Sequence, residues 1–138
     1  MREAAVHAHP RETGGILLGV WTEGRPWVTH ACELRSPDAG PAHYVLPAGA
    51  TCNLVEQMQR IDSRVGYLGD WHTHPIDAAA SGVDRRTVRR LIATIGSDAG
   101  VVLMVVRRRG RDHVLDAHLA DRRGMRPVSI VRTGDLPS

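Results

Sequence analysis

Hydrophobic and polar positions along the first half of the chain predict two strands, a helix and a third strand. An apolar run between glycines, residues 14–20, is typical of a buried strand, and residues 25–34 alternate loosely as a second strand. Over 50–64, apolar side chains recur at spacings of three and four, which predicts an amphipathic helix that ends at Gly66. Its apolar stripe consists of Leu54, Met58, Ile61 and Val65. Residues 67–73 follow as the third strand.

The second half of the chain continues this alternation. A helix is expected over 81–95, where apolar residues again recur at helical spacing. Three more strands are predicted, at 101–106, 113–119 and 128–131. The first of these is continuously apolar, which favours a central position in a sheet. A short helix is also expected over 2–9, and a loop over 36–43.

These elements predict one domain, 1–138, of the α/β (α+β) class, with helices packed on a mixed β-sheet. A chain of 138 residues is long enough for one hydrophobic core, and 42% hydrophobic residues is typical of a globular protein. The sequence has no apolar run of about 18 residues, the length that a membrane helix needs. Its N-terminus has no signal-like apolar stretch. We therefore expect a cytoplasmic protein without membrane contacts.

Every basic side chain other than histidine is an arginine, and twelve of the 18 arginines lie after residue 84. This bias and the formal net charge of +3 are compatible with an acidic partner or a nucleic acid. No aromatic residue interleaves with the run 107–109, although single-stranded nucleic acid binds by stacking on aromatic side chains. A solvated arginine-rich surface is therefore favoured, and a nucleic-acid partner is not expected.

Two histidines, His72 and His74, carry the main chemical signal. In a strand, residues i and i+2 point to the same side, about 7 Å apart along the chain, so both imidazoles can converge on one metal ion. Asp84 follows across a loop and can close a third position. Two histidines and one carboxylate suit a catalytic zinc site that keeps one position open for water. Taken alone, the pair is more simply explained as two unrelated histidines near a strand end.

Two further polar positions each have a structural and a functional interpretation. Ser81 and Asp84 have the spacing of a capping box at the start of a helix. That role is compatible with metal binding, because a ligand in the first turn of a helix is held rigidly. Glu12 stands just before the buried strand 14–20, from where a carboxylate can approach a central site. Taken alone, it is more simply explained as a surface acid.

Three segments together resemble the JAMM (JAB/MPN+) zinc metalloproteases, in particular their stand-alone bacterial members. They are residues 12–19 (ETGGILLG), residues 71–75 (WHTHP) and the pair Ser81 and Asp84. The resemblance covers about residues 2–106 and keeps these polar positions in the family's order. The loop between His74 and Ser81 is one residue shorter than in many members.

The resemblance implies a cytidine-deaminase-like MPN/JAMM fold and one Zn2+ per chain, held by His72, His74 and Asp84. It also implies that Glu12 is the general base and that Ser81 stabilises the tetrahedral oxyanion. This chemistry is coherent, since zinc lowers the pKa of bound water to about 7 and a carboxylate can pass the proton to the leaving amine.

The resemblance also implies the kind of substrate. Members of the family that this chain resembles cleave the amide bond that joins the C-terminal Gly-Gly tail of ubiquitin or a ubiquitin-like protein to an amine. Glu12 and His72 are only 60 positions apart, which leaves little room for the insertions of members that read polyubiquitin. The expected substrate is therefore a ubiquitin-like or sulfur-carrier protein, trimmed at its tail or released from a conjugate. An E1-like adenylating enzyme is the expected further partner in such a pathway.

Three other interpretations stay open. A non-catalytic MPN-type scaffold would only bind partners, although such scaffolds typically lose ligand positions that this chain keeps. A nucleic-acid-associated protein would depend on Arg107–Arg109 and would bind in a strongly salt-dependent manner. A zinc amidase acting on a small metabolite would turn over its substrate without a carrier protein.

Overall fold

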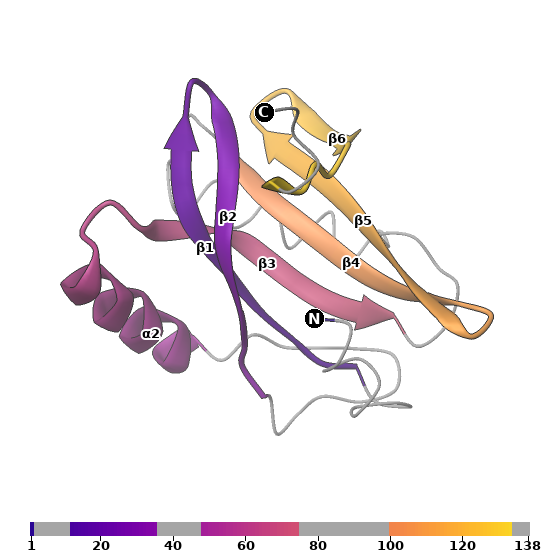
Figure 1. The fold of residues 1–138 in the computed structure, drawn as a ribbon, viewed down its shortest axis with the longest axis horizontal. Helices are drawn as coiled ribbons and strands as arrows, with labels where there is room; N and C mark the ends of the chain where they lie inside the picture. The colour runs from indigo at the N-terminus through magenta and orange to yellow at the C-terminus, as the bar shows by residue number, and fades with distance from the viewer. Residues whose placement is uncertain (2–11, 36–47, 75–99, 134–138) are drawn as a thin grey trace.

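The computed structural model describes residue 1 and residues 12–35, 48–74 and 100–133. These residues form a six-stranded sheet in the order β2-β1-β3-β4-β5-β6, with one described helix, α2, beside it (Figure 1). The elements are β1 (Gly14–Thr22), β2 (Arg25–Glu33), α2 (Ala48–Ile61), β3 (Gly66–His74), β4 (Val101–Arg109), β5 (Asp112–Asp121) and β6 (Gly124–Val128). Neighbouring strands are antiparallel except β3 and β4, which run parallel. The predicted mixed sheet is therefore confirmed.

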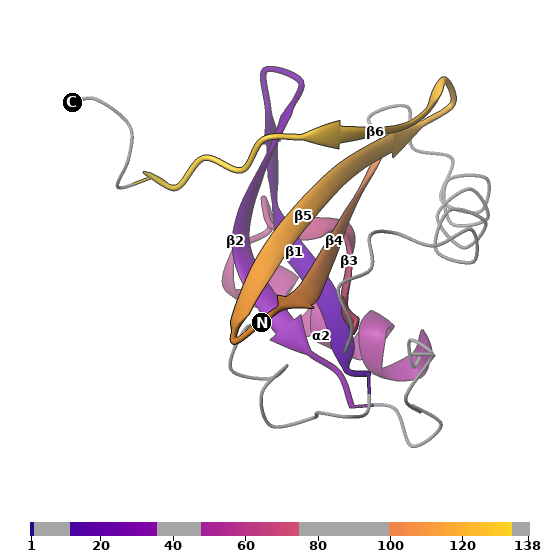
Figure 2. The same cartoon turned by 90° about the vertical axis from the view of Figure 1, so that its right-hand side faces the viewer.

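Five of the six predicted strands are confirmed, with small differences at their ends. The apolar run 101–106 is buried on both faces and lies between β3 and β5, as its composition predicts. The sheet is strongly twisted, so β2 and β6 point in different directions when it is viewed from the side (Figure 2). The helices expected over 2–9 and 81–95 and the loop over 36–43 lie outside the described residues. Among the helical residues that are described, none belong to a helix able to cross a membrane.

The end of α2 differs from the prediction, because the helix stops at Ile61 and not at Gly66. The Asp62 side chain accepts a hydrogen bond from the Arg64 backbone N–H at 3.0 Å, and the backbone leaves the helix in a turn at this point. Ile61 was expected in the apolar stripe but is 81% exposed. Val65 is buried as expected, although it lies beyond the helix.

The last strand lies at Gly124–Val128, so its prediction at 128–131 is wrong. A two-residue turn, 122–123, joins β5 to β6, and its second backbone N–H donates to the Asp121 side chain at 2.8 Å. This tight turn fixes where pairing with β5 begins, and the pairing ends at residue 128. The apolar residues 130–131, which suggested a strand, remain exposed.

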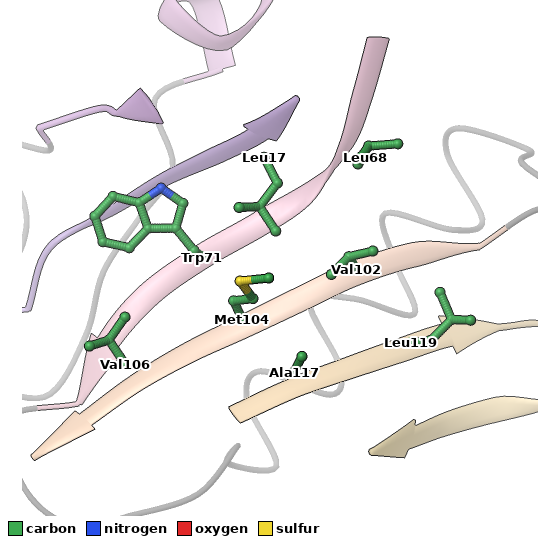
Figure 3. Packing of buried hydrophobic residues seen from close by; sticks show 8 residues of the cluster. All are labelled: Leu17, Leu68, Trp71, Val102, Met104, Val106, Ala117 and Leu119. Atoms are coloured by element: carbon green, nitrogen blue, oxygen red, sulfur yellow. The ribbon is translucent and has the colours of Figure 1, made fainter. Parts of the chain in front are cut away.

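One face of the sheet carries a hydrophobic cluster that includes Trp71 (Figure 3). Its buried members are Leu17, Leu68, Trp71, Val102, Met104, Val106, Ala117 and Leu119. Because they come from four adjacent strands, they link the β-sheet from β1 to β5. The Trp71 indole N–H also donates to the Cys32 carbonyl oxygen on β2, at 3.2 Å. Trp71 is therefore a core residue, as expected for an aromatic side chain beside the histidines.

The opposite face, here called the α2 face, is apolar where the helix covers it and polar toward the end of β3. Ile16 and Leu18 of β1 are fully buried in one cluster with side chains of α2. Asp70 pairs with Ile16 across the β1–β3 ladder, so its side chain is on the α2 face. His72 and His74 follow at steps of two along β3 and share that face.

Close approach of β2 to β1 leaves no room for a side chain at Gly15. A Cβ added there would lie 1.8 Å from the Cys32 carbonyl oxygen and 2.9 Å from Trp71 Nε1. We expect Gly15→Ala to lower the free energy of unfolding by about 1–3 kcal/mol or more, because the two strands must separate. Urea unfolding measures this. The control is Gly49→Ala in α2, where nothing lies within 4 Å and stability should be unchanged or slightly raised. Equal losses in the two variants would contradict the close packing of β1 on β2.

Candidate metal centre and active site

Two buried imidazoles converge at the carboxyl end of β3. His72 and His74 are each only 8% exposed, and their Nε2 atoms lie 3.0 Å apart. The ring centroids are 4.9 Å apart and the ring planes are tilted by 54°. The expectation that both histidines share one side of the strand is therefore confirmed. The same ring nitrogen of each histidine approaches a common point, which is the arrangement that two ligands of one ion require.

This geometry fits zinc as far as the described ligands extend. Zn–N bonds of about 2.0–2.1 Å in a tetrahedron place two ligand nitrogens about 3.3 Å apart, close to the observed separation. Zinc needs at least one more protein ligand than this pair, and Asp84 and Ser81 lie outside the described residues. Over residues 12–35, 48–74 and 100–133, no group of three or more histidine, cysteine or acidic side chains is placed to hold a metal ion. The described part of the site thus consists of two histidines, each of which can offer one ring nitrogen to a metal ion.

The start of β1 brings Glu12 to this pair. Gly14 pairs with His72, and the Thr73 backbone N–H donates to the Thr13 carbonyl oxygen at 2.8 Å. One further step in the same antiparallel register sets Glu12 opposite His74. Residues directly opposite in a ladder point to the same face, so Glu12 shares the α2 face with both imidazoles. Glu12 is buried, which removes its alternative interpretation as a surface acid.

Two threonines that the sequence analysis did not single out brace this junction. The Thr13 backbone N–H donates to Thr73 Oγ1 at 2.9 Å, and the Thr13 hydroxyl donates to Glu33 Oε1 at 2.9 Å. Both threonines are buried. Thr13 follows Glu12, and Thr73 lies between the two histidines. These bonds therefore tie the backbone that carries Glu12 to the backbone that carries both imidazoles. A hydroxyl residue between the two histidines is the one feature of the sequence that could have indicated these bonds.

We expect Thr73→Val to destabilise the protein by about 1–3 kcal/mol, because it leaves the buried Thr13 N–H without its acceptor. It should also lower kcat while zinc content stays unchanged, since Glu12 loses its brace. Thr73→Ser keeps the hydroxyl and should retain most of both properties. Thermal unfolding and turnover are the measurements. Thr22→Val at the exposed end of β1 is a control for which we expect little change in either. A Thr73→Val enzyme with wild-type kcat would contradict the bracing role.

A half-buried acid, Asp70, lies next to the histidines along the same face. The Tyr67 hydroxyl donates to Asp70 Oδ1 at 2.7 Å. Burial raises the pKa of Asp70 to about 6, against the opposing effects of the Tyr67 hydrogen bond and the charge of His72. Burial and the Asp70 charge also raise the pKa of Tyr67, which therefore stays a hydrogen-bond donor at neutral pH. When ionised, Asp70 adds negative charge on the histidine side of the sheet and so favours a bound cation.

On the other side of β3, the neighbouring strand supplies an arginine. His74 pairs with Arg107 of β4, and in this register the Arg107 side chain points to the α2 face. Its guanidinium forms an ion pair with Asp116 of β5, and both side chains are mostly buried. His74 therefore has Glu12 opposite it on one neighbouring strand and Arg107 on the other. The charge of Arg107 is offset by that of Asp116.

Comparison with solved structures supports the fold. The solution structure of protein DSY2949 from Desulfitobacterium hafniense matches with a TM-score of 0.71, covering 94% of this chain and 85% of that chain. The two sequences are 22% identical, so this likeness concerns the fold alone.

Two curated relatives carry names that concern hydrolysis. The first is the CD-NTase/cGAS isopeptidase of Vibrio cholerae serotype O1, 29% identical over 116 residues that cover 75% of this chain and 67% of the relative. The second is the probable metalloprotease y4qB of Sinorhizobium fredii, 32% identical over 107 residues that cover 69% of this chain and 58% of the relative.

The family assignment comes from a match over most of the chain. Residues 1–126 match the family described as prokaryotic homologs of the JAB domain. This range contains all five residues of the candidate site, from Glu12 to Asp84. The resemblance inferred from the motifs is thereby confirmed at the level of the family. The chain belongs to the prokaryotic homologs of the JAB domain (Prok-JAB).

Proposed function

We propose that the protein is a zinc-dependent peptidase or isopeptidase that hydrolyses an amide bond at the C-terminal Gly-Gly tail of a ubiquitin-like or sulfur-carrier protein. The observation that carries the proposal is the pair of buried imidazoles at the end of β3, whose Nε2 atoms are 3.0 Å apart. The register of β1 on β3 sets the buried Glu12 opposite His74. The relatives named as an isopeptidase and a probable metalloprotease favour hydrolysis with the aid of a metal.

In this proposal His72, His74 and Asp84 hold one zinc ion, and Asp84 is included because of its place in the family motif. Zinc, when bound, supplies Lewis acidity, which makes water acidic enough to deprotonate near neutral pH and polarises the scissile carbonyl. Two neutral imidazoles and a carboxylate leave the site with one net positive charge. That residual charge favours attack on a carbonyl that becomes anionic.

The protein's own side chains move the protons. Glu12 accepts a proton from the attacking water and then delivers it to the leaving amine, which would otherwise be too basic to depart. Burial at the start of β1 keeps the carboxylate aligned with His74, and the bonds of Thr13 to Thr73 limit its movement. Ser81 donates a hydrogen bond to the oxyanion on the substrate carbonyl, a contribution of about 3 kcal/mol when such a donor is well placed.

The choice of a Gly-Gly tail follows from the resemblance of the motifs to those of the JAMM metalloproteases. The name of the Vibrio cholerae relative favours a protein conjugate as the substrate, and an E1-like adenylating enzyme would then make the bond that this protein cleaves.

The test uses a ubiquitin-like protein whose Gly-Gly tail is extended by a short peptide, and the same protein joined to a peptide lysine. Intact mass spectrometry identifies the products. We expect cleavage after the second glycine of at least one substrate, loss of activity after chelation, and recovery with added zinc. A protein that holds one zinc per chain yet cleaves neither substrate would favour the scaffold or the small-molecule amidase.

A further inference from the structure

A turn rich in arginine lies at the same end of the sheet as the candidate site. Residues 107–112 contain four arginines and one aspartate, and they form the end of β4, the turn and the start of β5. β3 and β4 are parallel, so the end that carries His74 is also the end at which this hairpin begins (Figure 1). Strand residues rise about 3.3 Å each, which places the turn about 10 Å beyond the pair His74–Arg107.

The outer arginines of this turn face solvent. Arg108, Arg109 and Arg111, here called the arginine hairpin, are all exposed, whereas Arg107 is turned inward to Asp116. The Arg108 Nε donates to the Gly110 carbonyl oxygen at 3.0 Å, which stiffens the turn through an uncharged acceptor. The side chains of the hairpin therefore present positive charge on a rigid support beside the site.

A second arginine turn in the same sheet serves as an internal comparison. Arg122 and Arg123 join β5 to β6 at the opposite end of β5, away from the histidines. There Asp121 accepts from the Arg123 backbone and forms an ion pair with Arg126 at 3.0 Å. That turn has its own acidic partner, and it does not adjoin the site.

We propose that the arginine hairpin is a docking surface for an acidic segment of the protein substrate whose tail enters the site. This inference rests on the proposed function. Four or five extended residues span about 15 Å, so one segment can contact the hairpin while the chain beyond it reaches His74. Guanidinium groups suit carboxylates because they donate two parallel hydrogen bonds. A peptide fits better than a single-stranded nucleic acid, because residues 107–112 hold no aromatic side chain on which bases stack. Duplex DNA is therefore the competing ligand that the test must include.

The charge complementarity should mainly raise the rate at which acidic substrates meet the hairpin and the preference for them over neutral substrates. Exposed ion pairs are individually weak and are screened by salt, so the hairpin should matter through several contacts together and at low ionic strength. It would select acidic carriers over neutral ones that have the same Gly-Gly tail.

The test measures binding by fluorescence anisotropy with three probes. They are a labelled peptide with four glutamates, a spacer and a Gly-Gly end, the same peptide with glutamines, and a 20-base-pair DNA duplex. Wild type is compared with Arg109→Glu/Arg111→Glu and with Arg122→Glu/Arg123→Glu, which changes the net charge by the same amount. We expect wild type to prefer the glutamate peptide by about tenfold or more at low salt. The hairpin variant should lose this preference and the control should keep it.

Three outcomes would overturn the inference. Equal binding of the two peptides would remove the acidic preference. Equal loss in both double variants would mean that only the overall charge matters. Binding of DNA that depends on the hairpin, without a preference between the peptides, would assign the surface to nucleic acid. None of these measurements needs zinc or Glu12, so failure of the docking surface and failure of the proposed hydrolysis are distinguishable.

Discussion

Glu12→Gln is expected to lower kcat by about 10²- to 10⁴-fold while the protein keeps its zinc and its fold. The amide has the size of the carboxylate and can stay in the buried position opposite His74, but it cannot accept a proton from water. Proton transfer to the leaving amine is lost with it. Steady-state kinetics on a Gly-Gly substrate, with elemental analysis of the same sample, measures both quantities.

Zinc content and thermal unfolding separate this role from a structural one, because a general base can be lost without loss of the metal or of the fold. Glu56→Gln is a control, because Glu56 is an exposed acid on α2 that has no part in the junction of β1 and β3. We expect it to retain most of the activity. A Glu12→Gln enzyme of wild-type kcat would remove Glu12 from the mechanism.

His74→Ala is expected to abolish zinc binding at stoichiometric metal and all zinc-dependent cleavage with it. Loss of a residue that hydrogen-bonds to a metal ligand typically lowers metal affinity by about 10- to 100-fold. Loss of the ligand itself should lower the affinity for zinc further. The substitution also removes a buried side chain, so thermal unfolding must show that the variant still folds. His30→Ala on exposed β2 removes a histidine far from the site and should leave zinc content and activity intact. Full zinc in His74→Ala would contradict the assignment of this ligand.

The strands could be predicted from the sequence because the burial of each strand follows from its own pattern of apolar residues. Residues 14–20 and 101–106 are apolar on both faces and are buried on both faces, and no distant contact is needed to see this. Local spacing likewise placed His72 and His74 on one side of β3. The shared face of these two side chains follows from a period of two residues, which is a property of any strand.

The misplaced elements share a physical cause. Ile61 continued a helical spacing, but Asp62 ends the helix with a side-chain bond to a backbone N–H that the apolar pattern does not record. The apolar residues 130–131 suggested a strand, but the tight turn 122–123 sets the register of β6 and pairing ends before them. In both cases the position of the element depends on a turn and not on the pattern of apolar residues.

The junction around Glu12 depended on information that no single segment contains. Its position opposite His74 follows from the register of β1 on β3, over a separation of about 60 residues along the chain. The bonds of Thr13 to Thr73 and Glu33 likewise join three segments. Only the family motif placed Glu12 in the site beforehand, because spacing along one strand cannot reveal a neighbour on another.

Zinc content per chain, measured by elemental analysis of the purified protein, tests the central claim most directly. The wild type, Glu12→Gln and His74→Ala are prepared together and dialysed against the same buffer with a trace of zinc. The account predicts about one zinc per chain in the wild type and in Glu12→Gln, and almost none in His74→Ala. A wild type that binds no metal even with zinc supplied would contradict it, and the converging imidazoles at the end of β3 would then need another explanation.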